Sequence, residues 1–447
     1  FFMNLALMPF EDAAYLEVLA HEFQHMIHQN EQPGSAIWFN EGASQLAADL
    51  NGYVDHGFPR SYLSDTDLQL TSWSGAPTRS TRHYGASHLF MRYIYAQYAG
   101  EAQMRPLMRA NAGNKLEAFV ALAAPTHPDL TDFGQIVANW AVANLIDNPT
   151  VADGRYSYDT GHALPNLLFQ RVRPMDVRLG QHSATLAQFG AAYLELPANA
   201  SRVTFAGEPV VPLVGAQPMG QHAWWSFYGD DSIATLTRAF DLRDLATATL
   251  QFDTWYEIEN DYDYAFVTVS TDGGQTWMTL PGNLTTDHDP QGVNYGFGLT
   301  GMSGHPDADL DSNVRGTWVE ERMDLTPYTG QEVLVRFWQI NDQALEGSGI
   351  MFDNIAIPEL EFFDDAENDA AKWEAEGFVR VSGTLPQQWE VRLVRTSADG
   401  QVRVEHLSVD HDRTMHAEIA PGERAVLVVV PTTPHTLERA SYRVVVE

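Results

Sequence analysis

The sequence contains no cysteine, so no disulfide bond can form and cysteine usage says nothing about the compartment. It also has no run of about 18 apolar residues, so no transmembrane helix is expected. Basic residues are scarce: 26 lysines and arginines stand against 59 aspartates and glutamates, giving a formal net charge of −33. This excess of acidic side chains argues against binding to nucleic acid or to an anionic membrane. It suits a secreted protein that must stay soluble, and one that binds Ca²⁺.

The chain has 447 residues, more than one hydrophobic core supports, so two or three domains are expected. Its 44% hydrophobic and 19% charged residues are ordinary for a globular protein. The sequence begins at Phe1 without an initiator methionine or a signal peptide, and residues 1–8 are predicted to form an apolar strand. We therefore expect this chain to be an excerpt, or a processed form, of a longer protein.

Residues 21–25 have the sequence HEFQH, an H-E-x-x-H motif, inside a helix predicted over residues 11–29. Helical geometry puts His21 and His25 one turn apart on the same side, where both imidazoles can bind one Zn²⁺. Glu22 then lies beside the open coordination position, where it can accept a proton from water. The apolar residues of the helix recur on the other side and are predicted to pack into the core: Leu16, Leu19, Ala20, Phe23 and Ile27.

The third metal ligand decides the class of this site. One alternative is Glu31, which stands where metzincin proteases carry their third ligand, but His28 replaces the glycine that their tight turn needs. The other is Glu41, because the proline and glycine at 33–34 end the first helix and residues 36–50 are predicted to form a second. We expect Glu41 to complete the zinc site with the two histidines, with Glu31 as the rival. His28 is expected at the surface or behind the ligands.

The motif at 21–25, followed by W-F-N-E-G at 38–42, resembles the gluzincin metalloproteases, in which a glutamate on a later helix binds zinc. Among them the chain looks closest to the hyicolysin-like bacterial peptidases, where W-L-N-E-G is typical. The resemblance implies a mainly α zincin-type catalytic domain, the lower half of a gluzincin, followed by all-β domains. One departure is Gln45, because thermolysin-like members have an aspartate there that orients the first histidine. A neutral amide can accept that hydrogen bond but would raise the basicity of the imidazole less.

Peptidases of this type use a tyrosine or histidine to hydrogen-bond the oxyanion of the tetrahedral intermediate. Tyr84 and His83, at the start of a third helix predicted over residues 84–99, are the candidates for this role. The alternative is that Tyr84 belongs to the core behind the site. His88, one turn further on, is expected to be structural.

Residues 1–175 are predicted to form the zinc metallopeptidase domain, which we expect to be incomplete at its N-terminus. Residues 51–80 are rich in Gly, Ser, Thr, Asp and Pro and predict a long loop. Two more helices are expected at 115–124 and 131–146, the second with Asp132 or the preceding threonine as its N-cap.

From about residue 185 the pattern is nearly all β, with short alternating runs broken by turn residues. Residues 270–277 match the Asp-box S-x-D-x-G-x-T-W, a hairpin turn that usually serves folding rather than binding. Residues 176–220 are predicted to be a linker and a β segment that can pair with a C-terminal β-sandwich at 361–447. In that case the domain between them would be an insertion.

Residues 221–360 resemble the C-terminal region of immune inhibitor A metalloproteases. The matching strings are W-W-S at 224–226, the segment 253–277, L-T-G at 299–301 and G-I-M-F-D-N-I at 349–355. The resemblance implies a jelly-roll β-sandwich. Such domains commonly join an acidic residue near the first strand to one on the last to bind Ca²⁺, and Asp231 and Asp353 fit that pattern, with Asp261 and Asp263 as alternatives.

The predicted function is therefore that of a secreted zinc endopeptidase that acts on a protein or peptide substrate. The β-domains would hold the substrate, contact a cell surface or glycan, or stabilise the protease. Two alternatives remain. One is a non-catalytic adhesin or carbohydrate-binding protein that uses the aromatic-rich β-domains. The other is a metzincin-like protease that uses Glu31 as its third ligand.

Overall fold

The computed structural model describes residues 9–447 except 11, 54–56, 75–76, 159–170, 230, 311, 313, 343–344, 346, 369–370 and 409–413. The strand predicted at residues 1–8 lies outside the described residues. The chain divides into two compact units, one formed by Phe1–Val211 with Pro386–Glu447 and the other by Pro212–Leu385. These boundaries differ from those predicted at residues 175, 220 and 360.

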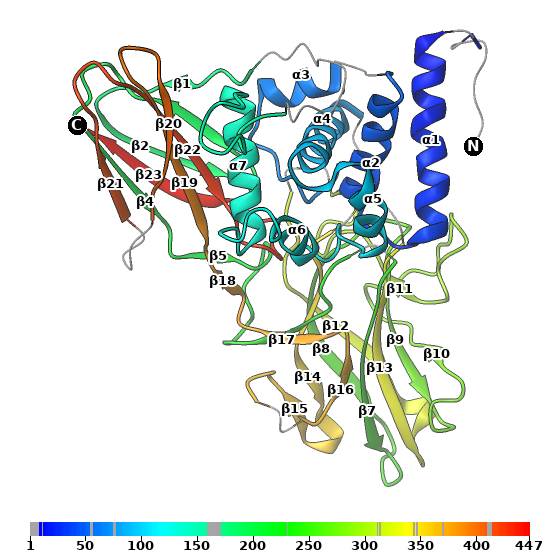
Figure 1. Cartoon of the computed structure of the whole chain (residues 1–447). Helices are drawn as coiled ribbons and strands as arrows, with labels where there is room; N and C mark the ends of the chain where they lie inside the picture. The colour runs from blue at the N-terminus through cyan, green and yellow to red at the C-terminus, as the bar shows by residue number, and fades with distance from the viewer. Residues whose placement is uncertain are drawn as a thin grey trace. The chain divides into compact units, whose positions relative to one another are not determined.

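Among the described residues, the α-helices and one π-helix lie in the N-terminal part of the first unit (Figure 1). They are α1 (Ala13–Glu31), α2 (Ile37–Leu50), α3 (Gly57–Ser64), α4 (Pro77–Ile94), the π-helix η1 (Tyr95–Ala99), α5 (Gly100–Arg109), α6 (Glu117–Ala123) and α7 (Phe133–Ile146). In the described part of the chain, no helix is long and apolar enough to cross a bilayer.

Local signals explain where the helices begin. The Asp12 side chain accepts a hydrogen bond from the Ala14 amide at 3.1 Å and caps α1. Asp132 accepts from the Gln135 amide at 3.0 Å, so the predicted N-cap of α7 is confirmed at that residue. The long loop predicted over residues 51–80 is wrong in part, because α3 and the start of α4 lie within it.

The strands of the first unit come from two distant parts of the sequence. They are β1 (Met175–Asp176), β2 (Gly180–Leu186), β3 (Ala192–Glu195), β4 (Arg202–Gly207), β19 (Trp389–Thr396), β20 (Val402–His406), β21 (Thr414–Glu418), β22 (Arg424–Pro431) and β23 (Ala440–Val446). A five-stranded sheet has the order β1-β3-β22-β19-β20, and a four-stranded sheet has the order β2-β23-β4-β21. One apolar core joins the two sheets, with Phe205 and Val444 on one side and Val391 and Leu427 on the other. The early β segment therefore pairs with the C-terminal strands.

The expectation of a mainly α zincin-type catalytic domain is wrong. The chain is mostly β-sheet from residue 175 onward, and the N-terminal helices share their core with the five-stranded sheet. That core joins Trp38 of α2 and Phe90 of α4 with Val394 of β19 and Val428 of β22. The physical reason is α7, which is buried nearly all round and so needs a sheet on one face as well as helices on the other. Figure 1 shows α7 against β19 and β22, which it contacts.

The second unit consists of two packed sheets. Its strands are β6 (Ala223–Trp225), β7 (Ile233–Asp241), β8 (Thr249–Glu257), β9 (Tyr264–Ser270), β10 (Met278–Thr279), β11 (Gly298–Leu299), β12 (Val319–Asp324), β13 (Glu332–Ile340), β14 (Gly349–Ile357), β15 (Phe362–Asp364), β16 (Glu374–Glu376) and β17 (Val379–Val381). The central orders are β10-β9-β13-β7-β16 and β12-β8-β14-β6-β17, and both sheets contribute to one core. For example, the rings of Phe252 and Phe337 meet edge to face at 5.1 Å. The short strands β5 (Val210–Pro212) and β18 (Thr384–Pro386) pair with each other.

The Asp-box has the folding role predicted for it. Asp272 accepts hydrogen bonds from the amides of Gln275 and Thr276, both at 2.9 Å, and from the Thr276 hydroxyl at 2.6 Å. The Trp277 indole donates to the Gly274 carbonyl at 3.1 Å. The polar groups of the motif therefore form their hydrogen bonds within the turn itself and close it.

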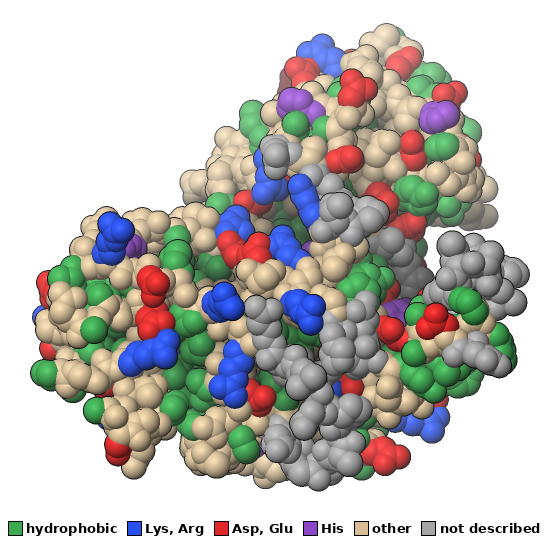
Figure 2. Space-filling view, turned by 90° about the horizontal axis from the view of Figure 1, so that it is seen from above, with side chains coloured by type: hydrophobic (Ala, Val, Ile, Leu, Met, Phe, Trp, Pro, Cys, Tyr) green, Lys and Arg blue, Asp and Glu red, His purple; other side chains and the backbone are tan. Residues whose placement is uncertain are grey.

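The apolar side of α1 is a further correction. Phe23, Met26 and Ile27 are 56%, 54% and 50% exposed, whereas the buried residues of the helix are His21 and His28. The predicted packing of this stripe into the core therefore fails at Phe23 and Ile27 among the described residues. Helix α1 contacts α2 with its histidine side instead. Figure 2 shows hydrophobic side chains reaching the surface in several places between interspersed acidic and basic ones.

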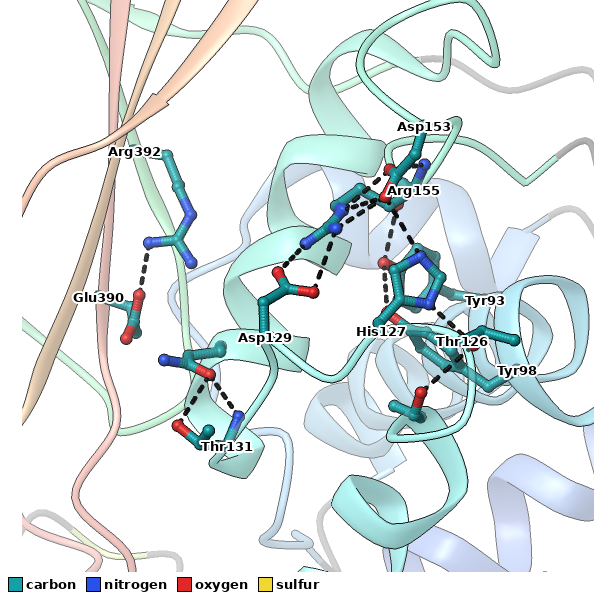
Figure 3. A network of polar contacts seen from close by, with 12 residues as sticks. Tyr93, Tyr98, Thr126, His127, Asp129, Thr131, Asp153, Arg155, Glu390 and Arg392 are labelled. Carbon is teal, nitrogen blue, oxygen red and sulfur yellow. Dashed lines mark hydrogen bonds and ion pairs between the residues drawn. The ribbon is translucent and has the colours of Figure 1, made fainter.

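A polar network secures the segments before and after α7 (Figure 3). The Arg155 guanidinium donates to Asp129 at 2.6 Å and to Asp153 at 2.7 Å, and His127 lies 3.5 Å from Asp153. The hydrogen bond from Arg155 is the main reason that the pKa of Asp153 falls to about 2. The Tyr93 hydroxyl of α4 donates to the Arg155 carbonyl at 2.8 Å, so the network also ties α4 to this region.

Candidate metal centre

Three side chains from α1 and α2 converge on one point. The Nε2 atoms of His21 and His25 lie 3.0 Å apart, and Glu41 Oε2 lies 3.1 Å from the first and 3.4 Å from the second. Within the described residues this is the one group of three or more potential ligands whose donor atoms gather closely enough to hold a metal ion. Helical spacing explains the two histidines, and the packing of α2 on α1 brings Glu41 to them.

The donor set fits Zn²⁺. Two ligand atoms 2.0–2.1 Å from a tetrahedral ion lie about 3.3 Å apart, close to the three separations observed here. Glu41 Oε2 is buried, and besides the imidazoles no hydrogen-bond donor satisfies it within the described part of the chain. A buried carboxylate oxygen of this kind, facing two imidazole nitrogens, is what a cation would stabilise.

The electrostatics also favour a charged Glu41. Burial opposes ionisation, but hydrogen bonds and charges from His21 and His25 outweigh it and lower the pKa of Glu41 to about 2. Burial likewise opposes the protonation of His25, yet Glu41 outweighs it and raises the pKa of that imidazole. The site therefore carries a full negative charge from Glu41 at neutral pH.

The far nitrogen of His25 is fixed by α2. Its Nδ1 lies 3.1 Å from Asn40 Oδ1 and 3.1 Å from Ser44 Oγ. The Ser44 hydroxyl donates to Gln24 Oε1 at 2.5 Å, so its oxygen remains free to accept from the imidazole. With the proton on Nδ1, the lone pair of His25 Nε2 faces the other two donor atoms.

His21 is fixed through Gln45. The amide nitrogen Nε2 of Gln45 lies 3.2 Å from His21 Nδ1, so a flip of the amide would be needed to bring its oxygen to the ring. The oxygen of the amide can accept from Nδ1–H when it faces the ring, because the two orientations of an amide differ only by a flip. The contact is buried and neutral, so it orients the imidazole without adding charge.

Helix α2 is held in place from behind by α4. The Asp49 carboxylate of α2 lies 3.1 Å from His88 Nε2 and also contacts Arg92, and all three are buried. Gly42, next to Glu41, allows the close approach, because a Cβ there would lie 2.7 Å from the Ser87 carbonyl oxygen. This backbone contact explains the glycine of the W-F-N-E-G string.

Of the two candidates for the oxyanion, the structure brings Tyr84 to the site. Its ring lies 6.2 Å from that of His21. Burial, followed by the charges of Glu41 and Glu22, raises the pKa of the Tyr84 phenol, so it stays a proton donor. Those charges also show that half-buried Glu22 lies near the tyrosine. His83 is buried and packs instead against Trp73, with ring centroids 5.4 Å apart.

Local patterns did not predict which residues hold Tyr84. Its ring stacks on Phe58 of α3 at 5.0 Å and meets Trp73 edge to face at 4.9 Å. Both partners come from the stretch predicted to be a loop. Phe58 and Trp73 are aromatic residues within a stretch that is otherwise mostly polar. That feature could have drawn attention to them, but no local pattern pairs either residue with Tyr84.

Glu31 lies away from the imidazoles. Its two carboxylate oxygens accept from Arg105 and Arg109 of α5 at 2.5 and 2.6 Å. The hydrogen bond from Arg109 is the main cause of the lowering of its pKa to about 2. The metzincin-like arrangement therefore has no support in the geometry, since Glu31 is engaged with α5.

The predicted calcium ligands Asp231 and Asp353 lie on different segments of the second unit, and calcium binding there stays a prediction. Asp231 donates its amide to the Asp342 carbonyl at the end of β13, whereas Asp353 lies on β14 of the other sheet and accepts from the Met219 amide. The alternative Asp263 is buried and accepts from the amides of Glu259 and Asp342. Asp261 donates its amide to the Thr300 hydroxyl at 2.9 Å.

Comparison with known proteins supports the assignment of the β region. The family model of the immune inhibitor A-like MAM domain matches residues 202–383, so the predicted likeness is confirmed and extends beyond 221–360. The pre-pro-metalloprotease PrtV of Vibrio cholerae is 28% identical over 39% of this chain and 17% of its own length. Immune inhibitor A of Bacillus thuringiensis is 31% identical over 37% of this chain and 22% of its own length.

Bacillopeptidase F of Bacillus subtilis is 24% identical over 26% of this chain and 6% of its own length. The chain thus spans less than a quarter of each of these relatives. A solved α-L-rhamnosidase of Streptomyces avermitilis aligns with 62% of this chain and 32% of its own, at 12% identity and a TM-score of 0.19. That score supports no conclusion about the fold. The likeness to proteins named as metalloproteases therefore concerns part of the chain, at low identity.

Proposed function

We propose that this chain is a zinc-dependent endopeptidase with a gluzincin-type ligand set of His21, His25 and Glu41. The observation that carries the proposal is the convergence of their three donor atoms within 3.4 Å of one another. The similarity of residues 202–383 to a domain of immune inhibitor A-like proteins is consistent with a protease, although it lies outside the site. The low pKa of Glu41 and the contact of His25 Nδ1 with the Asn40 oxygen support it further.

Zn²⁺ held by this donor set would lower the pKa of a bound water to near neutral and polarise the scissile carbonyl. Glu22 would accept the proton of that water and deliver it to the leaving amine. Tyr84, held by Phe58 and Trp73 with its phenol protonated, donates a hydrogen bond to the developing oxyanion. Asn40 and Gln45 keep the imidazoles oriented.

The proposal extends to the setting in which the protein works. A net charge of −33 suits an extracellular protein, and the substrate would be a protein or peptide. Residues 212–385 would contact the substrate, a cell surface or a glycan, or stabilise the protease. Calcium in this β region stays a prediction, and a melting experiment with Ca²⁺ tests it.

The test is turnover of casein or a peptide by the wild type and by Glu22→Gln, with zinc content measured on the same samples. Glutamine keeps the shape of Glu22 but cannot accept a proton, so turnover should fall by about 10²–10⁴-fold while zinc stays bound. His21→Ala should lose both zinc and turnover. Near-normal turnover by zinc-loaded Glu22→Gln would refute the mechanism. A wild type that neither binds zinc nor cleaves would favour the non-catalytic adhesin.

A further inference from the structure

Ser44 is a buried residue whose hydroxyl joins α2 to α1 beside the metal ligand His25. Its oxygen lies 2.5 Å from Gln24 Oε1 and 3.1 Å from His25 Nδ1. A serine inside a helix commonly donates to the carbonyl four residues earlier in its own helix. Ser44 donates across to the neighbouring helix instead, so its single proton is committed to Gln24.

The two distances agree with this direction of the hydrogen bonds. O–H···O bonds in proteins measure about 2.5–3.0 Å between heavy atoms, and N–H···O bonds about 2.7–3.2 Å. The 2.5 Å contact is therefore one between the Ser44 hydroxyl and the oxygen of the Gln24 amide, rather than its nitrogen. Because this contact uses the proton of Ser44, the 3.1 Å contact is a bond that His25 Nδ1–H donates to Ser44 Oγ.

Without Gln24 the same hydroxyl can point the other way. A hydroxyl donates as readily as it accepts, and a Ser44 that donates to His25 Nδ1 would leave the ring proton on Nε2. That nitrogen faces His21 Nε2 at 3.0 Å and Glu41 Oε2 at 3.4 Å. An Nε2 that carries the ring proton has no lone pair for a metal, so the orientation of one hydroxyl affects whether His25 is ready to bind.

We propose that Gln24 is a positioning residue, which orients the Ser44 hydroxyl and thereby keeps the His25 imidazole in the tautomer that binds a metal. Gln24 lies inside the H-E-x-x-H motif, at a position whose identity the motif leaves open. Among the described residues, its side chain forms no hydrogen bond other than the one with Ser44. The inference rests on the proposed zinc site and adds to it a residue that acts through Ser44.

The expected effect is moderate, because Asn40 Oδ1 is a second acceptor for His25 Nδ1–H at 3.1 Å. Outer partners of metal-binding histidines typically change metal affinity by about 10–100-fold, and with Asn40 in place we expect the lower end, about tenfold. Gln24→Met removes the acceptor, because methionine has a similar length but its sulfur accepts hydrogen bonds only weakly. Ser44→Ala should bind zinc no more weakly than Gln24→Met, since an absent hydroxyl cannot donate to Nδ1.

The experiment measures the zinc dissociation constant of the 447-residue chain by chelator competition. The variants are Gln24→Met, Gln24→Glu, Ser44→Ala and the double variant Gln24→Met with Ser44→Ala. We expect Gln24→Met to bind zinc about tenfold more weakly than the wild type. The double variant should match Ser44→Ala, because Gln24 acts through that hydroxyl, whereas an effect on packing would add to the loss.

Two further variants serve as controls. Gln24→Glu keeps an acceptor oxygen for the Ser44 hydroxyl and should bind zinc at least as tightly as the wild type. Gln29→Met makes the same chemical change as Gln24→Met at an exposed position of α1, and it should leave the affinity for zinc unchanged.

Each other result overturns the inference. Equal affinity in the wild type and Gln24→Met would show that Gln24 does not act on the site. A double variant that binds more weakly than Ser44→Ala would show that Gln24 acts by packing, and an equal loss in Gln29→Met would show a general effect on α1. If Ser44→Ala does not fold, weaker binding by Gln24→Glu than by the wild type still contradicts the acceptor role. A wild type without stoichiometric zinc would remove the proposed function itself, an outcome distinct from a zinc-loaded wild type whose affinity Gln24→Met shares.

Discussion

Replacing Glu41 by glutamine tests the ligand set most directly. At a pKa of about 2 the carboxylate is fully charged at neutral pH, and its Oε2 lies 3.1 and 3.4 Å from the two Nε2 atoms. Glutamine has nearly the same shape, so the packing of α2 should survive, but the charge at the centre of the site is lost. Since groups that merely orient a ligand are worth about 10–100-fold in affinity, loss of a charged ligand should exceed about 100-fold. This corresponds to more than about 2.7 kcal/mol of zinc binding.

Glu31→Gln is the matched control. The chemical change is the same and the residue lies on the helix of the two histidines, but its carboxylate is paired with Arg105 and Arg109. The variant should bind zinc as the wild type does. The assay is zinc content after dialysis, followed by chelator competition for the samples that retain metal. If Glu31→Gln strips zinc and Glu41→Gln does not, the assigned third ligand is wrong and the metzincin-like alternative returns.

Four further outcomes are expected. Tyr84→Phe should lower kcat by about 10²–10³-fold with zinc content unchanged, and an unchanged kcat would exclude Tyr84 as the oxyanion donor. Arg155→Gln should cost at most about 1 kcal/mol at pH 7, because the ion pair is half exposed and screened by solvent. Arg155 depresses the pKa of Asp153 from 3.8 to about 2, so this stability is complete above about pH 4 and lost as pH falls toward 2. The gap in Tm between wild type and variant should therefore narrow in that range, and a constant gap would contradict the assignment. Added Ca²⁺ should raise the Tm of the zinc-loaded chain if the calcium prediction is right, and equal melts would remove it. A chain that ends at residue 385 should lose its zinc, because it lacks strands that complete the core behind α7, and retained zinc would refute that dependence.

Much of the candidate site follows from local rules. The spacing of His21 and His25 depends only on the helical repeat, and the break after α1 with a second helix containing Glu41 is visible as proline and glycine followed by an apolar periodic run. The convergence of these residues needs only that two successive helices pack against each other. Glu31, the rival third ligand, lies at the end of α1 and accepts hydrogen bonds from Arg105 and Arg109 of α5.

Other parts of the site depend on packing between distant segments. His28 has the spacing of a surface residue of α1, and only the position of α2 buries it against Phe39. Tyr84 is held by Phe58 and Trp73, which come from a stretch whose polar composition predicted a loop. Phe23 was predicted to be buried but is exposed. Periodicity identifies an apolar face of a helix, but it does not show whether another element covers that face.

The same limit explains the error in fold class. Every residue from Phe133 to Asn144 in α7 is buried apart from Gln135, and a helix apolar on all sides requires partners on all sides. Helices α4 and α6 contact it on one side, and β19 and β22 contact it on the other. Those strands follow α7 by more than two hundred residues, beyond the range of any local pattern. The residues proposed to hold zinc therefore lie in a helical layer whose core is closed by the C-terminal strands. Val394, Val426 and Val428 share that core with Trp38 and Phe39 of α2, the helix that carries Glu41. A substitution that shifts β22 would thus act on the metal centre through α7 and α2, although no residue of β22 belongs to the proposed ligand set.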